Sequence, residues 1–226
     1  MLIERFKYHQ LSRVNLNGKR HYECPGGSKV VSVTSVLSAT KSQKDMQSLN
    51  NWKKRTGYAR AAEITTSAAS RGTRIHDILE HYMVNGKISE PGNNPYAIEG
   101  YKMANHIIGQ GLSEVTAFYG AEVKLYYPEL YAGTTDCIAD YKGELAVIDF
   151  KQTNKPKKTE WVNDYFLQLA AYILAHNILY DTNITQGIIM MCDPNLTYQE
   201  WILTGDKLEE YKQLWWNRLY EYYSKY

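Results

Sequence analysis

Cysteine is scarce in this chain of 226 residues, and its three cysteines are widely separated. Cys24, Cys137 and Cys192 form no CxxC pair, so the sequence suggests neither a disulfide framework nor a thiolate metal site. Long apolar runs are also missing, since none approaches the roughly 18 to 20 residues that a membrane-spanning helix needs. The N-terminus has neither the apolar stretch of a secretory signal nor the features of a transit peptide. We therefore expect a soluble protein in a reducing cytoplasm.

Charge of one sign is not in excess, because 26 lysines and arginines stand against 24 aspartates and glutamates. The formal net charge of +2 is too small to indicate nucleic-acid binding by itself. Any electrostatic argument must rest on where the charges cluster. The 20 tyrosines could stack on unpaired bases, although tyrosines mostly pack at the edges of a core.

The length suits one domain with its own core, and the residue pattern predicts the order of its elements. We expect short strands and turns over residues 1–31 and a mostly helical stretch over 32–69, followed by helices over 71–84 and 93–108. Antiparallel strands at 115–127, 130–141 and 144–151 form a meander. A helix over 159–179, a strand over 186–192 and a helix over 208–226 complete the chain. The predicted class is α+β, or α/β with a mixed sheet.

Two aspartates of the predicted meander are expected to stand side by side. If residues 142 and 143 form the loop of a hairpin, the register places Asp136 directly opposite Asp149. Their Cβ atoms would then lie about 4.5 to 5.5 Å apart. Side chains alternate along a strand, so Lys151 falls on the same face as Asp149. The face therefore carries two acids and a base.

This face predicts phosphodiester hydrolysis. Two opposed carboxylates repel each other and require a positive charge, which a divalent cation supplies, and hard oxygen ligands favour Mg²⁺ or Mn²⁺. The metal would activate a water molecule, and Lys151 could orient that water or stabilise the transition state. A solvated hairpin with its polar side outward is the alternative. The apolar run from Leu145 to Phe150 favours a buried strand instead, where the carboxylate of Asp149 needs a partner.

Two further residues are candidates for the same site. His76 lies beside the apolar stripe of its predicted helix and could reach a cleft as a third metal ligand, an interpretation that depends on the hairpin. A lone helical histidine is more often a satisfied core or surface residue. Glu122, on the strand before the hairpin, is either an accessory ligand or the structural partner of a lysine, and we favour the lysine.

Several separated motifs resemble the PD-(D/E)XK nucleases of the RecB-like branch, and within it the exonucleases of mitochondrial genomes and their phage relatives. Four segments carry the resemblance: Gly72-Thr-Arg-Ile-His76-Asp-Ile-Leu-Glu80 is similar to the branch's histidine helix, Ala132-Gly-Thr-Thr-Asp136 to its first acidic strand, Val147-Ile-Asp149-Phe-Lys151 to its DxK strand, and Gln168-Leu-Ala-Ala-Tyr172 to its QxxxY helix. Segments 32–37 and 49–53 are similar to the entry region for DNA. The nominal proline before the first aspartate is Thr135 here, as is common in this branch.

The resemblance implies a restriction-endonuclease-like mixed sheet flanked by helices, and a metal-dependent exonuclease. It implies a metal site formed by His76, Asp136, Asp149 and the Phe150 carbonyl, with Lys151 as the catalytic lysine. It also implies that Gln168 and Tyr172 position DNA or the lysine. The alternative is that they are ordinary polar side chains of a packed helix without a functional role. Three scattered cysteines exclude the four-cysteine iron–sulfur cluster of some relatives.

The resemblance and the charge pattern together suggest where DNA binds. Positive charge gathers near the proposed metal at Arg71 and Arg74 and in the lysine run that starts at Lys155, although a solvated surface is the alternative for that run. Trp52 and Lys53 would belong to a path for a single strand. Residues 1–70 would form a mostly helical DNA-entry region and 71–226 the catalytic core of one nuclease domain.

We expect a monomer that acts on single-stranded DNA or DNA ends, together with replication or recombination proteins, in a bacterial or virus-infected host cytoplasm. No membrane association is expected, and no GxxxxGK[ST] motif indicates a helicase. Two alternatives remain open. One is a duplex or junction endonuclease of the same fold, and the other is a DNA-binding module that has lost catalysis.

Overall fold

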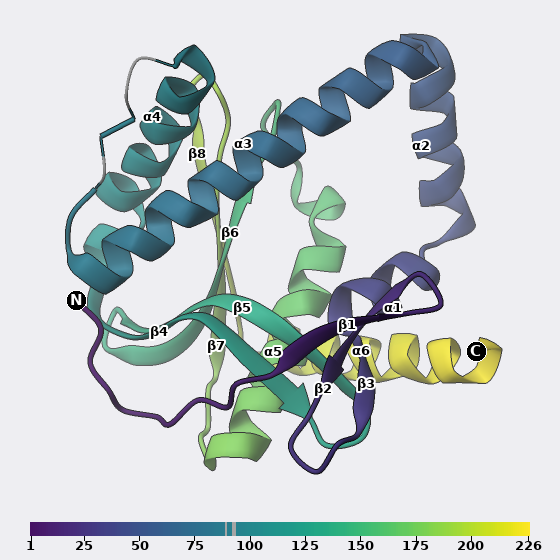
Figure 1. The fold of residues 1–226 in the computed structure, drawn as a ribbon, viewed down its shortest axis with the longest axis vertical. Coiled ribbons are helices and arrows are strands. Elements are labelled where there is room, and N and C mark those ends of the chain that lie inside the picture. Colours follow the sequence, from purple (N-terminus) through teal and green to yellow (C-terminus); the bar gives the residue numbers. More distant parts are fainter. Residues whose placement is uncertain (89, 92–93) are drawn as a thin grey trace.

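The computed structural model, which describes residues 1–88, 90–91 and 94–226, shows one mixed sheet of eight strands flanked by helices (Figure 1). The strands are β1 (Ser12–Leu16), β2 (Lys19–Glu23), β3 (Lys29–Ser32), β4 (Val115–Tyr127), β5 (Tyr131–Tyr141), β6 (Glu144–Gln152), β7 (Gln186–Cys192) and β8 (Tyr198–Thr204). The helices are α1 (Val33–Ala39), α2 (Gln43–Thr56), α3 (Tyr58–Asn85), α4 (Pro95–Gln110), α5 (Asn163–Tyr180) and α6 (Gly205–Lys225), with short 3₁₀ turns at Leu112–Glu114 and Thr159–Trp161. The predicted α+β class is confirmed.

The sheet runs β1-β2-β3-β5-β6-β7-β8, and β4 pairs with β5 off this path. The three central strands form the antiparallel meander that the sequence predicts. β3 joins β5 in parallel, and β7 joins β6 in parallel. The meander is local in sequence, whereas both parallel contacts require long connections, as parallel pairing does in general.

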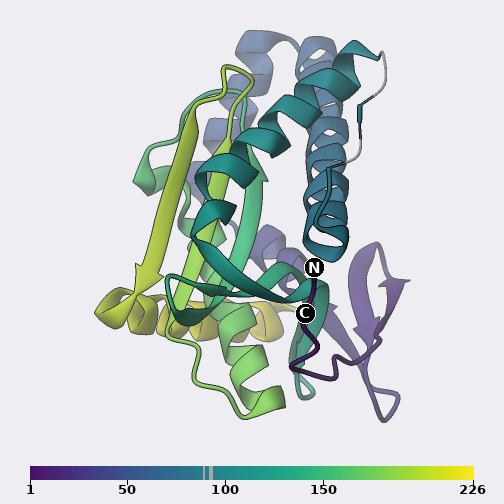
Figure 2. The same ribbon diagram turned by 90° about the vertical axis from the view of Figure 1, so that its left-hand side faces the viewer.

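Alternating residues send apolar side chains to both faces of the sheet. One face packs against α3 and α4 through residues such as Ile75, Met103 and Ile148. The other packs against α1, α5 and α6 through residues such as Leu169 and Trp215. Figure 2 shows α3 and α4 side by side on the face of the sheet that they cover. The central strands are therefore buried on both sides, which gives them the nearly continuous apolar runs seen in the sequence.

The N-terminal part differs from the expected arrangement of helices. α3 is one continuous helix of 28 residues where two helices, ending and starting near residues 64 and 71, were expected. The break lies earlier, at Gly57, whose φ of 82° ends α2. The stretch between the two expected helices, residues 65–70, contains neither proline nor glycine, so nothing in it stops a helix. The expected boundary at residues 70 and 71 falls inside α3.

β1, β2 and β3 lie where short strands and turns were expected, and the pairing of β3 with β5 makes them part of the main sheet. β8 was not predicted, because its side chains are mostly half-buried and polar, as in Gln199 and Glu200. The fourth helix is described from Pro95, and its expected start at Asn93 lies outside the described residues. No helix of the described chain is long and apolar enough to cross a membrane.

Candidate active site

The sheet is open along part of one edge of β5. β4 pairs with that strand from Tyr131 to Tyr141 and so occupies one edge. β3 and β6 must therefore share the other edge, where β3 pairs at Tyr131 and Ala132 and β6 pairs from Cys137 to Tyr141. In the described chain, residues 133–136 pair with neither of these two strands. The divergence of β3 from β6 leaves an opening at this point.

Three neighbouring strands each bring one acid to the opening. The flanking pairs of the β4–β5 ladder set Glu122 opposite Asp136. The β5–β6 ladder ends at Cys137 and Ile148, so Asp136 and Asp149 are the next residues along their strands. The hairpin register predicted from the sequence is thus confirmed up to the two aspartates. Just beyond it, the backbone N–H of Phe150 donates a hydrogen bond of 2.6 Å to the Asp136 carboxylate.

His76 reaches this acidic row from α3. Its Nδ1 lies 3.3 Å from Oδ1 of Asp136 and 3.8 Å from Oε1 of Glu122. Burial disfavours the imidazolium, but Asp136, with a contribution from Glu122, raises the pKa of His76 to about 10. Burial would likewise raise the pKa of Asp136, but the charge of His76 and the hydrogen bond to it lower that pKa below its ordinary value. The imidazolium form of His76 neutralises part of the negative charge of this row, and loss of its proton would free Nδ1 to bind a metal.

Asp149 and Lys151 form an ion pair deeper in the opening. Asp149 is fully buried, and apart from this ion pair its carboxylate oxygens have no hydrogen-bond partner among the described residues. Burial raises the pKa of Asp149 to about 7, although Lys151 acts in the opposite direction. Burial would lower the pKa of Lys151, but Asp149 and Asp136 raise it above its ordinary value. The ring of Tyr165 lies 5.1 Å from the lysine Nζ. The lysine is therefore held as a cation beside the acids.

The donor atoms of this site fit a divalent cation. One ligand atom from each of His76, Glu122 and Asp136 lies within 4.8 Å of the other two. The carboxylate of Asp149 is buried without hydrogen-bond donors in the described chain, apart from its ion pair with Lys151. Carboxylate oxygens are the ligands that Mg²⁺ and Mn²⁺ prefer, and imidazole extends the set to other transition metals.

A cleft of about 720 Å³ contains this row and several other predicted residues. His76, Asp136, Asp149 and Lys151 line it, as do Gln168 and Tyr172 from α5. The Gln168 amide donates to the Tyr172 hydroxyl at 3.2 Å. The helix that carries the QxxxY motif thus places both polar side chains on the wall opposite α3.

The other predicted residues lie outside the lining of this cleft. Arg71 donates to Gln152 and to Asn154, and so ties α3 to the end of β6. Arg74 packs beside Gly100 of α4. Lys155 is exposed in the loop after β6, Trp52 and Lys53 are half-buried on α2, and the Phe150 side chain is buried in the core. Their expected roles in binding DNA or metal remain predictions.

The structure brings Glu122, whose role the sequence left open, into the site and adds two arginines that the sequence analysis did not consider. Glu122 contacts His76, and its described ion pairs include no lysine, so the preference for a structural partner was wrong. Its strand position opposite Asp136 could have been found only with the β4–β5 register. Arg13 and Arg20 also line the cleft, from β1 and β2. The Asn17-Gly18 dipeptide, typical of a tight hairpin turn, was the available signal for that hairpin.

The mixed sheet flanked by helices, with acids and a lysine at the margin of its central strands, is consistent with a PD-(D/E)XK nuclease. No model of a known protein family matches the chain. Relatives are nevertheless found among curated proteins: mitochondrial genome maintenance exonuclease 1 of Xenopus tropicalis is 29% identical over 89% of this chain and 62% of its own length. The human protein of the same name is 29% identical over 81% of this chain and 58% of its own length. These homologues confirm the resemblance predicted from the sequence.

The chain spans about three fifths of the length of the curated relatives that it matches. Among solved structures, a phage-related exonuclease from Haemophilus somnus gives a TM-score of 0.38 at 14% identity, over 87% of this chain and 94% of its own. The relationship to exonucleases therefore rests on the sequence matches and not on this structural likeness. They also contradict the expected bacterial or virus-infected host cytoplasm, because the matched relatives are mitochondrial exonucleases.

Proposed function

We propose that this protein is a divalent-metal-dependent deoxyribonuclease that hydrolyses phosphodiester bonds from the ends of single-stranded or free-ended DNA. The observation that supports the proposal best is the row of Glu122, Asp136 and Asp149 on three adjacent strands, with Lys151 paired to the innermost acid. Such a row places several carboxylates where like charges would repel unless a cation neutralises them. The names of the curated relatives supply the reaction class.

In this proposal, His76, Glu122, Asp136 and Asp149 hold the ion, and the Phe150 carbonyl is a further predicted ligand. A bound Mg²⁺ or Mn²⁺ would lower the pKa of a coordinated water and neutralise charge on the scissile phosphate. Lys151 orients the attacking water or stabilises negative charge in the transition state through its ammonium group. The hydrogen bond from the Phe150 N–H fixes the orientation of the Asp136 carboxylate. Gln168 and Tyr172 position the substrate strand on the opposite wall.

The proposed substrate is DNA with a free end, and the same proposal includes action as a monomer alongside replication or recombination proteins. A duplex or junction endonuclease and a silent DNA-binding module remain the alternatives to be tested. Retention of both aspartates and of the lysine in one cleft favours catalysis over binding alone. We propose no iron–sulfur cluster, because three separated cysteines cannot hold one.

The test is cleavage of an end-labelled oligonucleotide with Mg²⁺ or Mn²⁺, with and without EDTA. We expect release of short products that EDTA stops, and loss of at least about a hundredfold in rate for Asp149→Ala and Lys151→Ala. Glu209→Gln, an exposed change on α6 that removes only a surface ion pair, should cleave like the parent protein. Full activity in either cleft variant would refute the assignment.

A circular single strand tests the requirement for an end. We expect the circle to survive under conditions in which its linearised form is degraded. Cutting of the circle at a comparable rate would identify an endonuclease, and binding without cutting of either form would identify a silent module.

A further inference from the structure

Two arginines at the margin of the cleft belong to no part of the acidic row. Arg13 stands on β1 and Arg20 on β2, in a hairpin whose register pairs them with Tyr22 and Asn15 respectively. Cross-strand partners share a face, and residues two apart along a strand share it too, so these four side chains lie on one face of the hairpin. Arg13, Arg20 and Tyr22 all line the cleft.

The hairpin is anchored to the strand that carries Asp136. Tyr22 is 2% exposed, and its hydroxyl lies 3.0 Å from the hydroxyl of Thr134, two residues before that aspartate on β5. β2 pairs with β3, which in turn pairs with β5 at the same end (Figure 1). The two arginines are therefore carried by the main sheet and are not on a detached loop.

Acidic side chains outnumber lysines and arginines in the lining of the cleft. Its lining holds five acids, namely Asp77, Glu80, Glu122, Asp136 and Asp149. Of the lysines and arginines in that lining, Lys151 is engaged with Asp149. The described residues give neither Arg13 nor Arg20 an ion pair or a side-chain hydrogen bond, and both arginines are exposed. They are the uncommitted positive charge at a cleft that would otherwise repel a polyanion.

We propose that Arg13 and Arg20 form a phosphate-binding edge that holds a phosphate of the DNA strand next to the one being cleaved. The inference deepens the proposed nuclease function and rests on it. A guanidinium offers several N–H donors in a planar fork that matches phosphate oxygens, and an arginine pair on one rigid face can hold one phosphate or two successive ones. The edge attracts and positions the strand, whereas the acids and Lys151 act on the scissile bond. Arg13 and Arg20 are thus positioning residues.

The test compares binding and turnover in Arg13→Gln, Arg20→Gln and the double variant. Fluorescence anisotropy of a labelled single-stranded oligonucleotide in EDTA measures binding without cleavage. We expect the double variant to bind about tenfold more weakly. The slope of log affinity against log salt should fall by roughly 1.4 for two lost contacts. In turnover, KM should rise while kcat changes little, because the arginines hold the strand away from the reacting atoms.

Matched controls separate charge at the edge from charge elsewhere. Lys29→Gln removes an exposed cation from β3 that does not line the cleft, and should leave affinity and salt slope unchanged. Arg13→Lys combined with Arg20→Lys retains the charges and should recover most of the salt slope. Unchanged affinity and salt slope in the double glutamine variant would overturn the inference, even if the parent protein cleaves DNA. If the parent protein does not cleave, the proposed function fails. The binding measurements would still show whether Arg13 and Arg20 bind phosphate.

Modified strands identify which phosphate is bound. Oligonucleotides with a 5′-phosphate, with a 5′-hydroxyl, or with neutral methylphosphonate linkages near one end are compared on the parent and the double variant. If the difference between the proteins disappears without the 5′-phosphate, the edge holds a terminal phosphate. If it disappears only with neutral linkages, the edge holds the backbone. If the double variant loses as much affinity for a fully neutral strand as for ordinary DNA, the arginines do not recognise phosphate.

Discussion

Glu122 has a backbone conformation that its strand does not explain. Its φ is 49°, a left-handed value that residues with a Cβ rarely adopt, in the middle of β4. Such strain persists only where surrounding structure maintains it, and it is concentrated at functional sites. Here the unusual conformation accompanies a side chain 3.8 Å from His76 and opposite Asp136. We infer that the conformation serves to aim this carboxylate into the cleft.

Removal of the Glu122 charge should weaken metal binding. Glu122→Gln keeps the size of the side chain but loses a charged oxygen ligand, so we expect Mn²⁺ affinity measured by calorimetry to fall by at least about tenfold. Glu80→Gln is the matched control, because Glu80 lines the same cleft but lies outside the group of three ligand atoms. Equal Mn²⁺ affinity in the parent protein and Glu122→Gln would show that Glu122 is not a ligand.

At the scale of elements, β5 and α5 fit together through one glycine. A Cβ on Gly133 would lie 2.6 Å from the ring of Tyr172 and 2.9 Å from its hydroxyl oxygen. Tyr172 is 2% exposed, so its ring has little room to move away. The bare backbone at this position lets α5 approach the open edge of β5 and brings Tyr172 to the cleft wall.

Gly133→Ala should therefore displace Tyr172 and the helix behind it. Overpacking of this kind costs about 1 to 3 kcal/mol, which urea unfolding would measure as a lower midpoint with an unchanged slope. We expect cleavage to fall as well, because Tyr172 would leave its position beside Gln168. The double change Gly133→Ala with Tyr172→Phe removes the hydroxyl but keeps the clashing ring, so stability should not recover; Gly133→Ala with Tyr172→Leu should recover part of it. Parent-like stability of the single variant would contradict this packing argument.

Elements formed by interactions between residues close in sequence were easier to predict than the others. The β5–β6 hairpin was predicted with its register, because a short loop and the alternation of side chains define it locally. α3 was predicted in two pieces, because its exposed half lacks a clear apolar stripe; between residues 58 and 74 only Ala61 is buried. β8 was missed, because an edge strand with polar, half-buried side chains differs little from a loop in its pattern.

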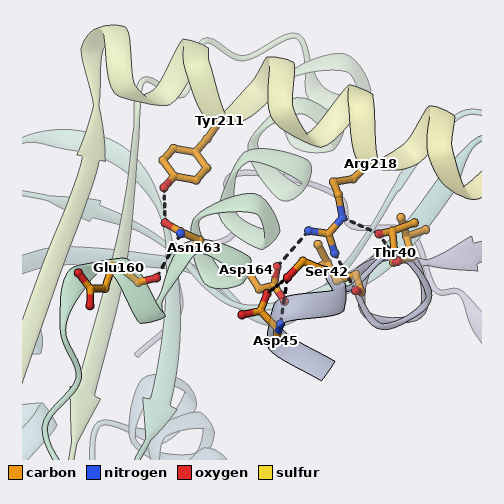
Figure 3. Close-up of polar contacts among 10 residues, drawn as sticks. Thr40, Ser42, Asp45, Glu160, Asn163, Asp164, Tyr211 and Arg218 are labelled. Carbon is orange, nitrogen blue, oxygen red and sulfur yellow. Dashed lines mark hydrogen bonds and ion pairs between the residues drawn. The ribbon is translucent and has the colours of Figure 1, made fainter. Parts of the chain in front are cut away.

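At the scale of the whole molecule, Arg218 connects the last helix to the first. Its guanidinium donates to the carbonyl of Leu37, to the hydroxyl of Thr40 and to the carboxylate of Asp164, as Figure 3 shows for the last two. Thr40 caps the C-terminal end of α1, just before Ser42 begins α2. One side chain of α6 thus holds the C-terminal end of α1 against α5, just before the chain enters α2.

Arg218→Met should destabilise the protein by about 2 to 3 kcal/mol, since it leaves the Leu37 carbonyl and its neighbours without a charged donor while retaining an apolar stem. The free energy of unfolding from urea titration measures this loss. Lys207→Met is the matched control on the same helix, because its ion pair with Glu210 is exposed and should contribute little. If both variants unfold at the parent midpoint, Arg218 does not brace the helices.

The amino-acid sequence by itself determined the parts of this protein that depend on neighbours along the chain: the α+β class, the meander, and the face of Asp136, Asp149 and Lys151. Turn residues and side-chain alternation act within a few positions, so their outcome can be worked out from the chain alone. The tertiary structure decided which distant residues join that face. Glu122 entered through pairing of β4, and Arg13 and Arg20 entered because β3 returns to β5. Those contacts depend on how separate elements pack, which no local pattern specifies.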